Sequence, residues 1–509
     1  MGTVTNITHV AGKSPTTYAK GDMSFSIGTV IRAHRGWPFT VIETDRNDFL
    51  DDFGVPDRTN ESGYQAKLAL HNHQNTVGKY VRVVPTTAAY PYIYFIDDVT
   101  PENRVVQSSS LFSSSLVEAS PTEPIVAILK NGETRDDMFG IQITNKLTDT
   151  FVVTVFENKQ NPVQVGLPLT VSLNPSAVGS DGSSIFIEQV FARKSSVVDF
   201  KVDASATMAD ITETTGIEWF TGGLDTAGEL QPTDYETAWG LLGNHQVELD
   251  QIFMAGDTVE TSIAAAVTIA DERDIRLECD FPMTGTVANE IIWLNGLNIA
   301  SHNVSFTYGK VSFNDPFYAG LRATTRVSGL VTSAKAYARE AAKTISDPSV
   351  EEAPAGEDFG LLRGVMGVRN ETPLNLVDKK ALADVWANYL INSTDKGVIV
   401  WEQFTLYGED TPYAYKRNVD VINYLYHTDA ATMQRQQFRG KTDWEIINSL
   451  SKVRDRLVAK GVLVADENDE EYPEPYSIWI NRNGASVEIN RAIRIQNAIG
   501  PIVMKTIPL

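Results

Sequence analysis

The nine residues that end the chain constrain its fold more than any other segment. They read Pro-Ile-Val-Met-Lys-Thr-Ile-Pro-Leu (501–509) and are mostly apolar, whereas a chain terminus is usually polar and frayed. An apolar segment of this kind must be buried, and its composition is typical of a β-strand. Two placements are open. It is either a last strand in the chain's own sheet or a strand donated to the sheet edge of a neighbouring molecule.

The charge distribution gives a modest preference to the second placement. The chain of 509 residues has a net charge of −22. In the segment 488–509, however, Arg491, Arg494 and Lys505 outweigh Glu488. A cationic, strand-forming tail on an acidic chain favours docking onto another copy of the chain. The alternative is that three positive charges in such a segment have no role. The acidic run 466–471 is expected to be a solvated loop.

Composition argues against several classes of partner. An acidic chain lacks the clustered Lys and Arg that phosphate binding needs, so nucleic acid is not expected. The sequence has no apolar run near the roughly 20 residues that span a bilayer, so no membrane contact is expected. The N-terminus has no signal-peptide pattern. A single cysteine, Cys279, permits no internal disulfide, which fits assembly in a reducing compartment.

The pattern along the chain predicts several domains. Residues 1–22 are polar and predict an N-terminal arm. Residues 23–89 read as strand, helix, helix and strand, the first part of an α/β core. From residue 90 to 216 short segments of period two predict an inserted β-sandwich or barrel, with 125–129 and 185–191 among its candidate strands. Residues 217–373 alternate strands and helices, which predicts a mostly parallel sheet.

A further α/β domain is expected over 374–487, followed by a C-terminal arm over 488–509. Residues 376–391 have near-helical apolar spacing, and 397–401 read as a buried strand. Residues 442–460 are the strongest predicted helix, because Thr442 and Glu445 form a capping box ahead of an apolar stripe. The stripe consists of Ile446, Leu450, Val453 and Leu457. Residues 477–482 and 487–495 alternate as strands.

The sequence shows no catalytic constellation. Gly440-Lys-Thr442 resembles the end of a phosphate loop, but Arg435 stands where that loop needs glycine. His71 and His73 have no third ligand at a known spacing, so no metal site is predicted. Cys279 lies in an apolar strand, where a buried thiol is the expected state. No cofactor is expected, and the chain is not predicted to be an enzyme, although a triad scattered through the sequence is not excluded.

Three blocks of residues resemble those of tail sheath proteins of contractile-tailed bacteriophages, a family related to the sheaths of contractile injection systems. The first block is Gly36-Trp-Pro-Phe-Thr-Val-Ile-Glu-Thr with Phe49, Phe53-Gly54 and Tyr80-Val-Arg-Val-Val84. The second is Gly222-Gly-Leu-Asp225 with Thr233-Asp-Tyr235, Ala238 and Ala255-Gly-Asp. The third is Leu374-Asn-Leu with Asp378, Tyr389-Leu-Ile-Asn, Gly397-Val-Ile-Val-Trp-Glu-Gln-Phe-Thr-Leu406 and Arg417-Asn-Val419. Glu402 and Phe404 depart from the smaller residues of the family pattern, and 90–215 matches nothing in it.

The resemblance implies a multidomain α/β (α+β) fold. Its core would have subtilisin-like topology and a C-terminal α/β domain, with an inserted β-rich domain and extended terminal arms. It also implies a structural virion protein. Such sheath subunits stack as hexameric rings around a tail tube and contract to drive the tube through the host envelope for genome ejection. The implied partners are other copies of the chain, the tail tube protein, and baseplate and tail terminator proteins.

Strand exchange between subunits is the expected use of the arms. The residues expected to take part are Ile499, Ile502, Val503, Met504, Ile507, Ile478, Ile480, Arg491 and Arg494. Two alternatives stay open from the sequence. One is a hydrolase on the subtilisin-like scaffold, and the other is a different virion protein, such as a baseplate or capsid component.

Overall fold

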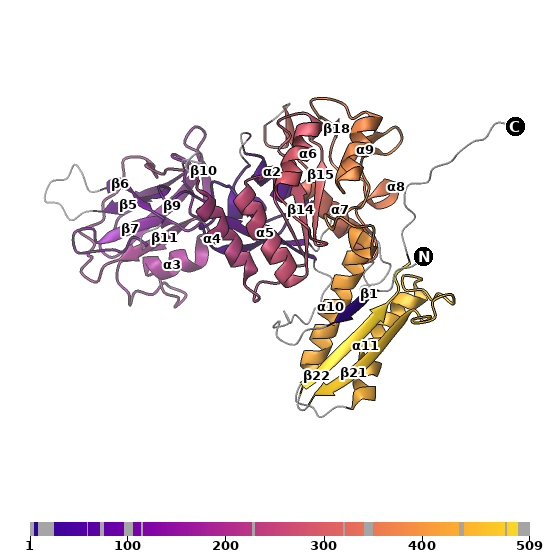
Figure 1. Ribbon diagram of the computed structural model, residues 1–509. Coiled ribbons are helices and arrows are strands. Elements are labelled where there is room, and N and C mark those ends of the chain that lie inside the picture. The colour runs from indigo at the N-terminus through magenta and orange to yellow at the C-terminus, as the bar shows by residue number, and fades with distance from the viewer. Residues whose placement is uncertain are drawn as a thin grey trace. The chain divides into compact units, whose positions relative to one another are not determined.

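The chain folds into two compact units (Figure 1). The computed structural model describes residues 5–8, 25–56, 58, 60–71, 76–95, 105–112, 116–225, 230–318, 321–340, 350–436, 442–483 and 486–496. The first unit comprises Met1–Thr29, Tyr64–Lys79 and Leu242–Leu509, and the second comprises Val30–Gly63 and Tyr80–Leu241. No helix within these described ranges has the length and apolar character needed to cross a bilayer.

A largely parallel sheet forms the centre of the first unit. Its strand order within this unit is β20-β19-β15-β14-β13-β2-β4. The strands are β2 (Phe25–Ile31), β4 (Thr76–Arg82), β13 (Gln251–Phe253), β14 (Arg276–Asp280), β15 (Val304–Tyr308), β19 (Asn388–Ser393) and β20 (Gly397–Trp401). Each pair from β2 through β19 is parallel, and β20 is antiparallel to β19. The predicted parallel sheet is confirmed.

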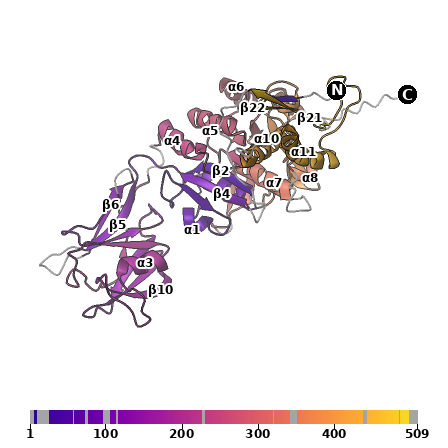
Figure 2. The same ribbon diagram turned by 90° about the horizontal axis from the view of Figure 1, so that it is seen from below.

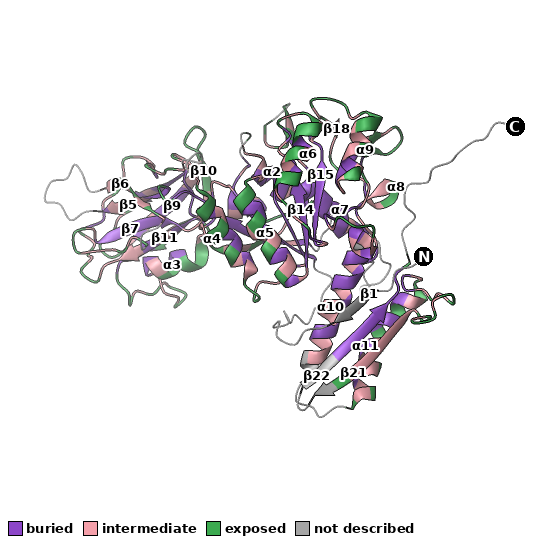
Figure 3. Cartoon of the chain, in the orientation of Figure 1, coloured by how far each residue is buried: buried purple, intermediate pink, exposed green. Residues whose placement is uncertain are grey.

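Helices cover both faces of this sheet, so strands such as β14 and β15 are buried throughout (Figure 3). Figure 2 shows α5 (Glu260–Arg273) and α6 (Val287–Gly296) next to each other on one face. The opposite face is covered by α7 (Ser328–Glu340) and by the start of α10 (Lys416–Gln436). The first unit also contains most of α2 (Glu61–Ala69), and all of α8 (Gly356–Phe359) and α9 (Leu376–Asp384), whereas α4 (Pro232–Gly243) belongs mostly to the second unit. A small sheet contains β16 (Val311–Asn314), β17 (Arg322–Thr325) and β18 (Gly367–Val368).

The C-terminal part of the first unit packs two helices on a three-stranded sheet. The helices are α10 and α11 (Asp443–Ala459), and a short 3-10 turn, Pro412–Ala414, precedes α10. The strands are β1 (Thr5–Thr8), β21 (Tyr476–Asn483) and β22 (Ser486–Ile493). The capping box of Thr442 and Glu445 is present, and the four residues of the predicted apolar stripe are buried. This helix is therefore confirmed as predicted.

The second unit contains a β-sandwich, one of the two predicted β architectures. One sheet has the order β10-β9-β8-β12 and the other β11-β7-β5-β6, and a single apolar cluster fills the space between them. The strands are β5 (Ala89–Phe95), β6 (Val105–Leu111), β7 (Ile125–Leu129), β8 (Phe139–Thr144), β9 (Phe151–Glu157), β10 (Val163–Val171), β11 (Val198–Val202) and β12 (Glu218–Trp219). The unit also contains β3 (Val41–Thr44), α1 (Phe49–Phe53) and α3 (Ile187–Lys194).

Two local predictions are wrong. Residues 376–391 are not one helix, because α9 ends at Asp384 and β19 begins at Asn388. Trp386 lies between them with φ of 59°, a left-handed conformation that interrupts a helix. Residues 185–191 are not a strand, because α3 covers most of them. The buried residues of α3 are Ile187, Val190 and Phe191, which share one face only in a helix.

Candidate functional site

The three-stranded sheet brings together both chain ends, which are the segments expected to exchange strands. β22 is its central strand, with β21 on one side and β1 on the other. Both pairings are antiparallel, with Ile478 opposite Arg491 in β21 and Ile7 opposite the same Arg491 in β1. Residues from the two ends of the sequence therefore hydrogen bond to the same strand, and in this structure they belong to one chain.

The predicted exchange residues fall into two groups. Ile478 and Ile480 of β21 lie partly buried against Ile446, Leu450 and Ile489, so they face the helices. Arg491 and Arg494 are buried. The remaining predicted residues, Ile499, Ile502, Val503, Met504 and Ile507, lie outside the described residues. Their part in strand exchange stays a prediction.

Arg491 belongs to a buried ionic triad that fixes the register of β22. Its guanidinium contacts the carboxylate of Asp429 in α10, which also binds Arg454 of α11 at 3.0 and 2.5 Å. All three residues are at most 5% exposed. Burial lowers the pKa of Arg491, and the charge of Asp429 opposes this shift. A slip of β22 by one residue would turn Arg491 to the other face of the sheet, so the triad specifies one register.

Arg494 forms ion pairs with the acidic run that follows α11. Its Nη1 lies 3.2 Å from the Asp466 carboxylate, and its Nη2 contacts Asp469. The pKa of Asp469 is lowered first by the backbone N–H of Tyr472 and then by Arg494. Two carboxylates of the run thus pair with the strand end, which the sequence analysis did not foresee. Arg491 and Arg494 both have acidic partners within their own chain.

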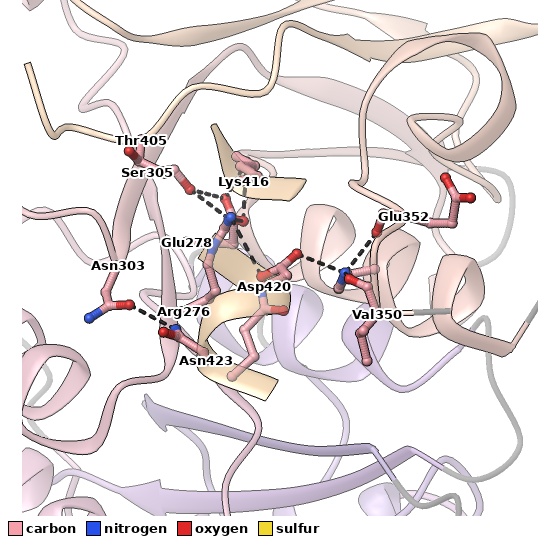
Figure 4. Close-up of polar contacts among 12 residues, drawn as sticks. Arg276, Glu278, Asn303, Ser305, Val350, Glu352, Thr405, Lys416, Asp420 and Asn423 are labelled. Atoms are coloured by element: carbon pink, nitrogen blue, oxygen red, sulfur yellow. Dashed lines mark hydrogen bonds and ion pairs between the residues drawn. The ribbon is translucent and has the colours of Figure 1, made fainter. Parts of the chain in front are cut away.

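A second buried network anchors the first turn of α10 on the parallel sheet (Figure 4). Lys416 donates to both oxygens of Glu278 in β14, at 3.1 and 2.9 Å, and the same carboxylate contacts Arg276. One turn further along α10, Asp420 pairs with Lys335 of α7 at 2.7 Å. The Lys335 ammonium also donates to the carbonyls of Val350 and Glu352. The network therefore joins α10, α7 and the sheet.

The network contains three cations and two carboxylates, and burial together with these charges shifts the pKa values of Lys416 and Glu278. Burial lowers the pKa of Lys416 to about 8, although Glu278 opposes the shift, and Arg276 lowers it further. Burial alone would raise the pKa of Glu278, but Lys416 and Arg276 outweigh it and leave that pKa below its usual value. At neutral pH Lys416 and Glu278 are therefore both charged.

The sequence offered one signal for Lys416. A lysine at the first position of a helix opposes the helix dipole, so its presence there indicates a specific partner. Asp429 and Glu278 gave no such signal, because their partners are distant in the sequence.

The motifs of the first two resemblance blocks meet at Arg82 in the second unit. The Arg82 guanidinium is fully buried and donates to the carbonyls of Gly36 and Gly132 at 2.8 and 2.7 Å. It also donates to Thr134 and lies 3.4 Å from the Asp225 carboxylate. Burial lowers the pKa of Arg82, and Asp225 opposes the shift. Gly36, Arg82 and Asp225 thus hold three distant segments together.

The polar residues at the carboxyl end of β14 form a structural cap. Asp280 accepts hydrogen bonds from the backbone N–H groups of Val327 and Ser328 at 2.8 Å, and from the Ser328 hydroxyl at 2.6 Å. Gln65 and Gly256 also donate to it. Ser328 is fully buried. A hydrolase serine needs an accessible hydroxyl beside a general base, whereas this hydroxyl is held by a carboxylate at the start of α7.

Other sequence candidates have ordinary structural roles. Thr442 is the N-cap of α11, while Gly440 and Lys441 lie outside the described residues. His73 also lies outside them. The part of the chain that the structure describes contains no group of three metal-ligating side chains. Cys279 is a buried thiol, as predicted, and burial raises its pKa.

Comparison with solved structures identifies the fold. The chain matches a sheath tail protein from Listeria innocua with a TM-score of 0.58 and 12% identity, over 95% of this chain and 94% of that one. It matches a sheath tail protein from Desulfitobacterium hafniense with a TM-score of 0.54 and 11% identity, over 94% of this chain and 99% of that one. The chain has the sheath tail protein fold. This confirms the multidomain α/β fold predicted from the resemblance.

The likeness to these two proteins comes from comparing structures. No protein-family model matches the sequence, and no curated protein matches it.

We expect the Asp429→Asn substitution to loosen β22. It leaves the buried guanidinium groups of Arg454 and Arg491 without a carboxylate, which costs about 3–5 kcal/mol when a buried ion pair loses one partner. Hydrogen exchange measured by mass spectrometry should show faster exchange over 486–493. Strands of the second unit serve as an internal reference, and Asp395→Asn on an exposed turn is the matched control. Unchanged protection of β22 would contradict the role of the triad.

We also expect Lys416 to make stability depend on alkaline pH. Its pKa is about 8 in the folded chain and near its usual value of about 10.4 when unfolded. Between these values the unfolded chain binds more protons, so the free energy of unfolding rises with pH, by at most about 1.4 kcal/mol per pH unit. Below pH 8 both states are protonated and the contribution is flat.

The test compares wild type with Lys416→Arg, which keeps the charge and removes the titration. The difference in unfolding free energy should grow in favour of wild type from pH 8 to 10. The control Lys396→Arg changes a half-exposed lysine, and its unfolding free energy should depend on pH in the same way as that of wild type. If the unfolding free energy of Lys416→Arg also follows the wild-type pH dependence, the lowered pKa of Lys416 is ruled out.

Proposed function

We propose that the chain is the structural subunit of a contractile tail sheath. It polymerises as stacked hexameric rings around a tail tube and contracts to drive the tube through a host envelope. The observation that carries this proposal is the match of almost the whole chain to two sheath tail proteins. The three-stranded sheet adds support, because one strand of it, β1, comes from the opposite end of the chain.

Strand exchange through this sheet is the proposed link between subunits. Residues 9–24 separate β1 from β2, and 16 residues can reach roughly 55 Å when extended. That length lets β1 pair with β22 of a neighbouring copy instead of its own. Backbone hydrogen bonds of such a strand survive a rotation of the subunit bodies. The segment 497–509 is proposed to act as the second arm, on the same kind of sheet edge.

Helix α11 is the proposed contact with the tube. Its exposed face carries Asn448, Lys452 and Arg456 at a spacing of four residues, with Trp444 before them and Lys460 after them. Trp444 is 72% exposed. A basic stripe that begins with an exposed tryptophan, on a chain with a net charge of −22, fits an acidic protein surface. The tail tube, the baseplate and a tail terminator are the proposed partners, with assembly in the host cytoplasm.

The first experiment is electron microscopy of the purified chain at high concentration. We expect hollow, striated tubes of uniform width. Shells or discs would favour a capsid or baseplate component instead. Monomers that turn over substrates in a panel of hydrolase assays would favour the hydrolase alternative.

Removal of either arm should abolish tubes without unfolding the subunit. Variants lacking residues 1–24 or 497–509 are expected to keep the circular dichroism spectrum of the full chain, because the buried clusters among the described residues are built from other segments. Micrographs should then show dispersed subunits, since each link between neighbours has lost a strand. Ordered tubes that still contract after both deletions would exclude the tether role.

Charge reversal on α11 should weaken binding to the tube. Lys452→Glu together with Arg456→Glu replaces attraction by repulsion at an acidic surface, so co-sedimentation with preformed tubes should fall and wild-type binding should weaken with salt. Lys380→Glu on the exposed side of α9 is the matched control. Equal binding of the double variant and the control would place the tube contact elsewhere.

A further inference from the structure

A cleft in the second unit lies between the residues that follow β2 and the segment from α1 to Gly63. The cleft encloses about 550 Å³, including space open to solvent, and Arg32 and His34 lie in its wall.

One wall of the cleft is apolar. Phe49 and Phe53 of α1 are buried beneath it, and Val55 and Pro56 continue the surface after that helix. A ligand with both a hydrocarbon part and a polar end would fit such a wall, because apolar groups bury surface there while the polar end needs a specific partner.

The polar side of the cleft includes the cationic side chain of Arg32. The Nε atom of Arg32 is buried and has no hydrogen-bond partner among the described residues. The one acidic side chain in the lining, Asp225, lies against the buried Arg82 at 3.4 Å. Acidic residues outnumber basic ones in this chain, 65 to 43. An arginine that lines a cleft and has no carboxylate partner among the described residues is suited to accept one from outside.

The backbone beneath Arg32 is fixed by three contacts from the following loop. The Arg32 N–H donates to the Ser62 hydroxyl at 3.0 Å, and the Arg32 carbonyl accepts from Asn60 at 2.8 Å and from the Ser62 hydroxyl at 3.4 Å. The position of the residue is therefore set before any ligand arrives, which reduces the entropic cost of binding.

We propose that this cleft is a carboxylate-binding site in which Arg32 pairs with the carboxylate and the Val55–Pro56 wall packs on the adjoining hydrocarbon. Two sources present this chemistry. One is an acidic side chain of a second copy of the chain, and this source rests on the proposed function. The other is a small carboxylate in solution. Neither source involves a covalent step.

The test uses the full chain with Arg32→Met, which keeps an apolar stem of similar length and removes the charge. Arg193→Met is the matched control, because Arg193 is an exposed arginine of α3 in the same unit. Circular dichroism of both variants checks that the fold is kept. The first readout is the thermal unfolding midpoint during a titration with succinate at constant ionic strength. The second is the critical concentration for assembly.

The outcomes separate the sources. If succinate raises the midpoint of wild type and Arg193→Met, with at least tenfold weaker response in Arg32→Met, the site takes free carboxylates. If succinate leaves the midpoints unchanged but Arg32→Met alone raises the critical concentration at least tenfold, the carboxylate comes from a neighbouring copy. Identical behaviour of Arg32→Met and Arg193→Met in both readouts overturns the proposal.

Failure of the proposed function would look different. A chain that forms no tubes in any variant, yet responds to succinate through Arg32, contradicts the sheath assignment and supports the carboxylate site. Tubes that form equally in all variants, with no response to succinate, support the sheath assignment and overturn the carboxylate site.

Discussion

The contact between Lys416 and Glu278 is the interaction on which the first unit depends. Strand β14 is buried on both faces, yet its sequence is Arg-Leu-Glu-Cys-Asp. Alternation in a strand directs Leu277 and Cys279 to one face and the charged residues to the other. Those charges tolerate burial only when paired. Lys416 supplies the pairing for Glu278, so the start of α10 is tied to the sheet by the cost of leaving a carboxylate alone in the interior.

The far part of α10 repeats this arrangement with different residues. Asp429 lies more than three turns beyond Lys416 and pairs with Arg454 of α11 and Arg491 of β22. A single helix thus carries one ion cluster that faces the parallel sheet and another that faces the three-stranded sheet. Because an α-helix resists bending, a force on β22 passes along α10 to the parallel sheet without needing a hinge between them. In a sheath, this would let the linking sheet pull directly on the subunit body.

The sequence revealed features that depend on local pattern. The capping box and stripe of α11, the parallel sheet and the alternating strands of the sandwich could all be predicted, because each leaves a pattern among residues close in sequence. The break at Trp386 could not be predicted, since the apolar spacing of Val385, Tyr389 and Leu390 suits a helix. What overrides it is tertiary: Asn388 donates to the carbonyls of Phe306 and Phe404, and the backbone N–H of Phe404 donates back to it. The acidic partners of Arg491 and Arg494 could not be predicted either, because these contacts join residues that are distant in the sequence.

The placement of Arg491 bears on how strand exchange and rigidity coexist. Its side chain points to Asp429 beneath the sheet, while its backbone lies opposite both Ile478 and Ile7. The side chain therefore fixes β22 to its own subunit, and the two edges of its backbone are left for strands on either side. β21 precedes β22 in the same chain and pairs with it along its whole length, so β1 is the strand proposed to come from another copy. In the proposed exchange β1 would pair with the backbone of β22 in another copy, and the triad of Asp429, Arg454 and Arg491 would stay within one subunit. Linkage between subunits would then rest on the backbone of β22, and stability within each subunit on the Arg491 side chain.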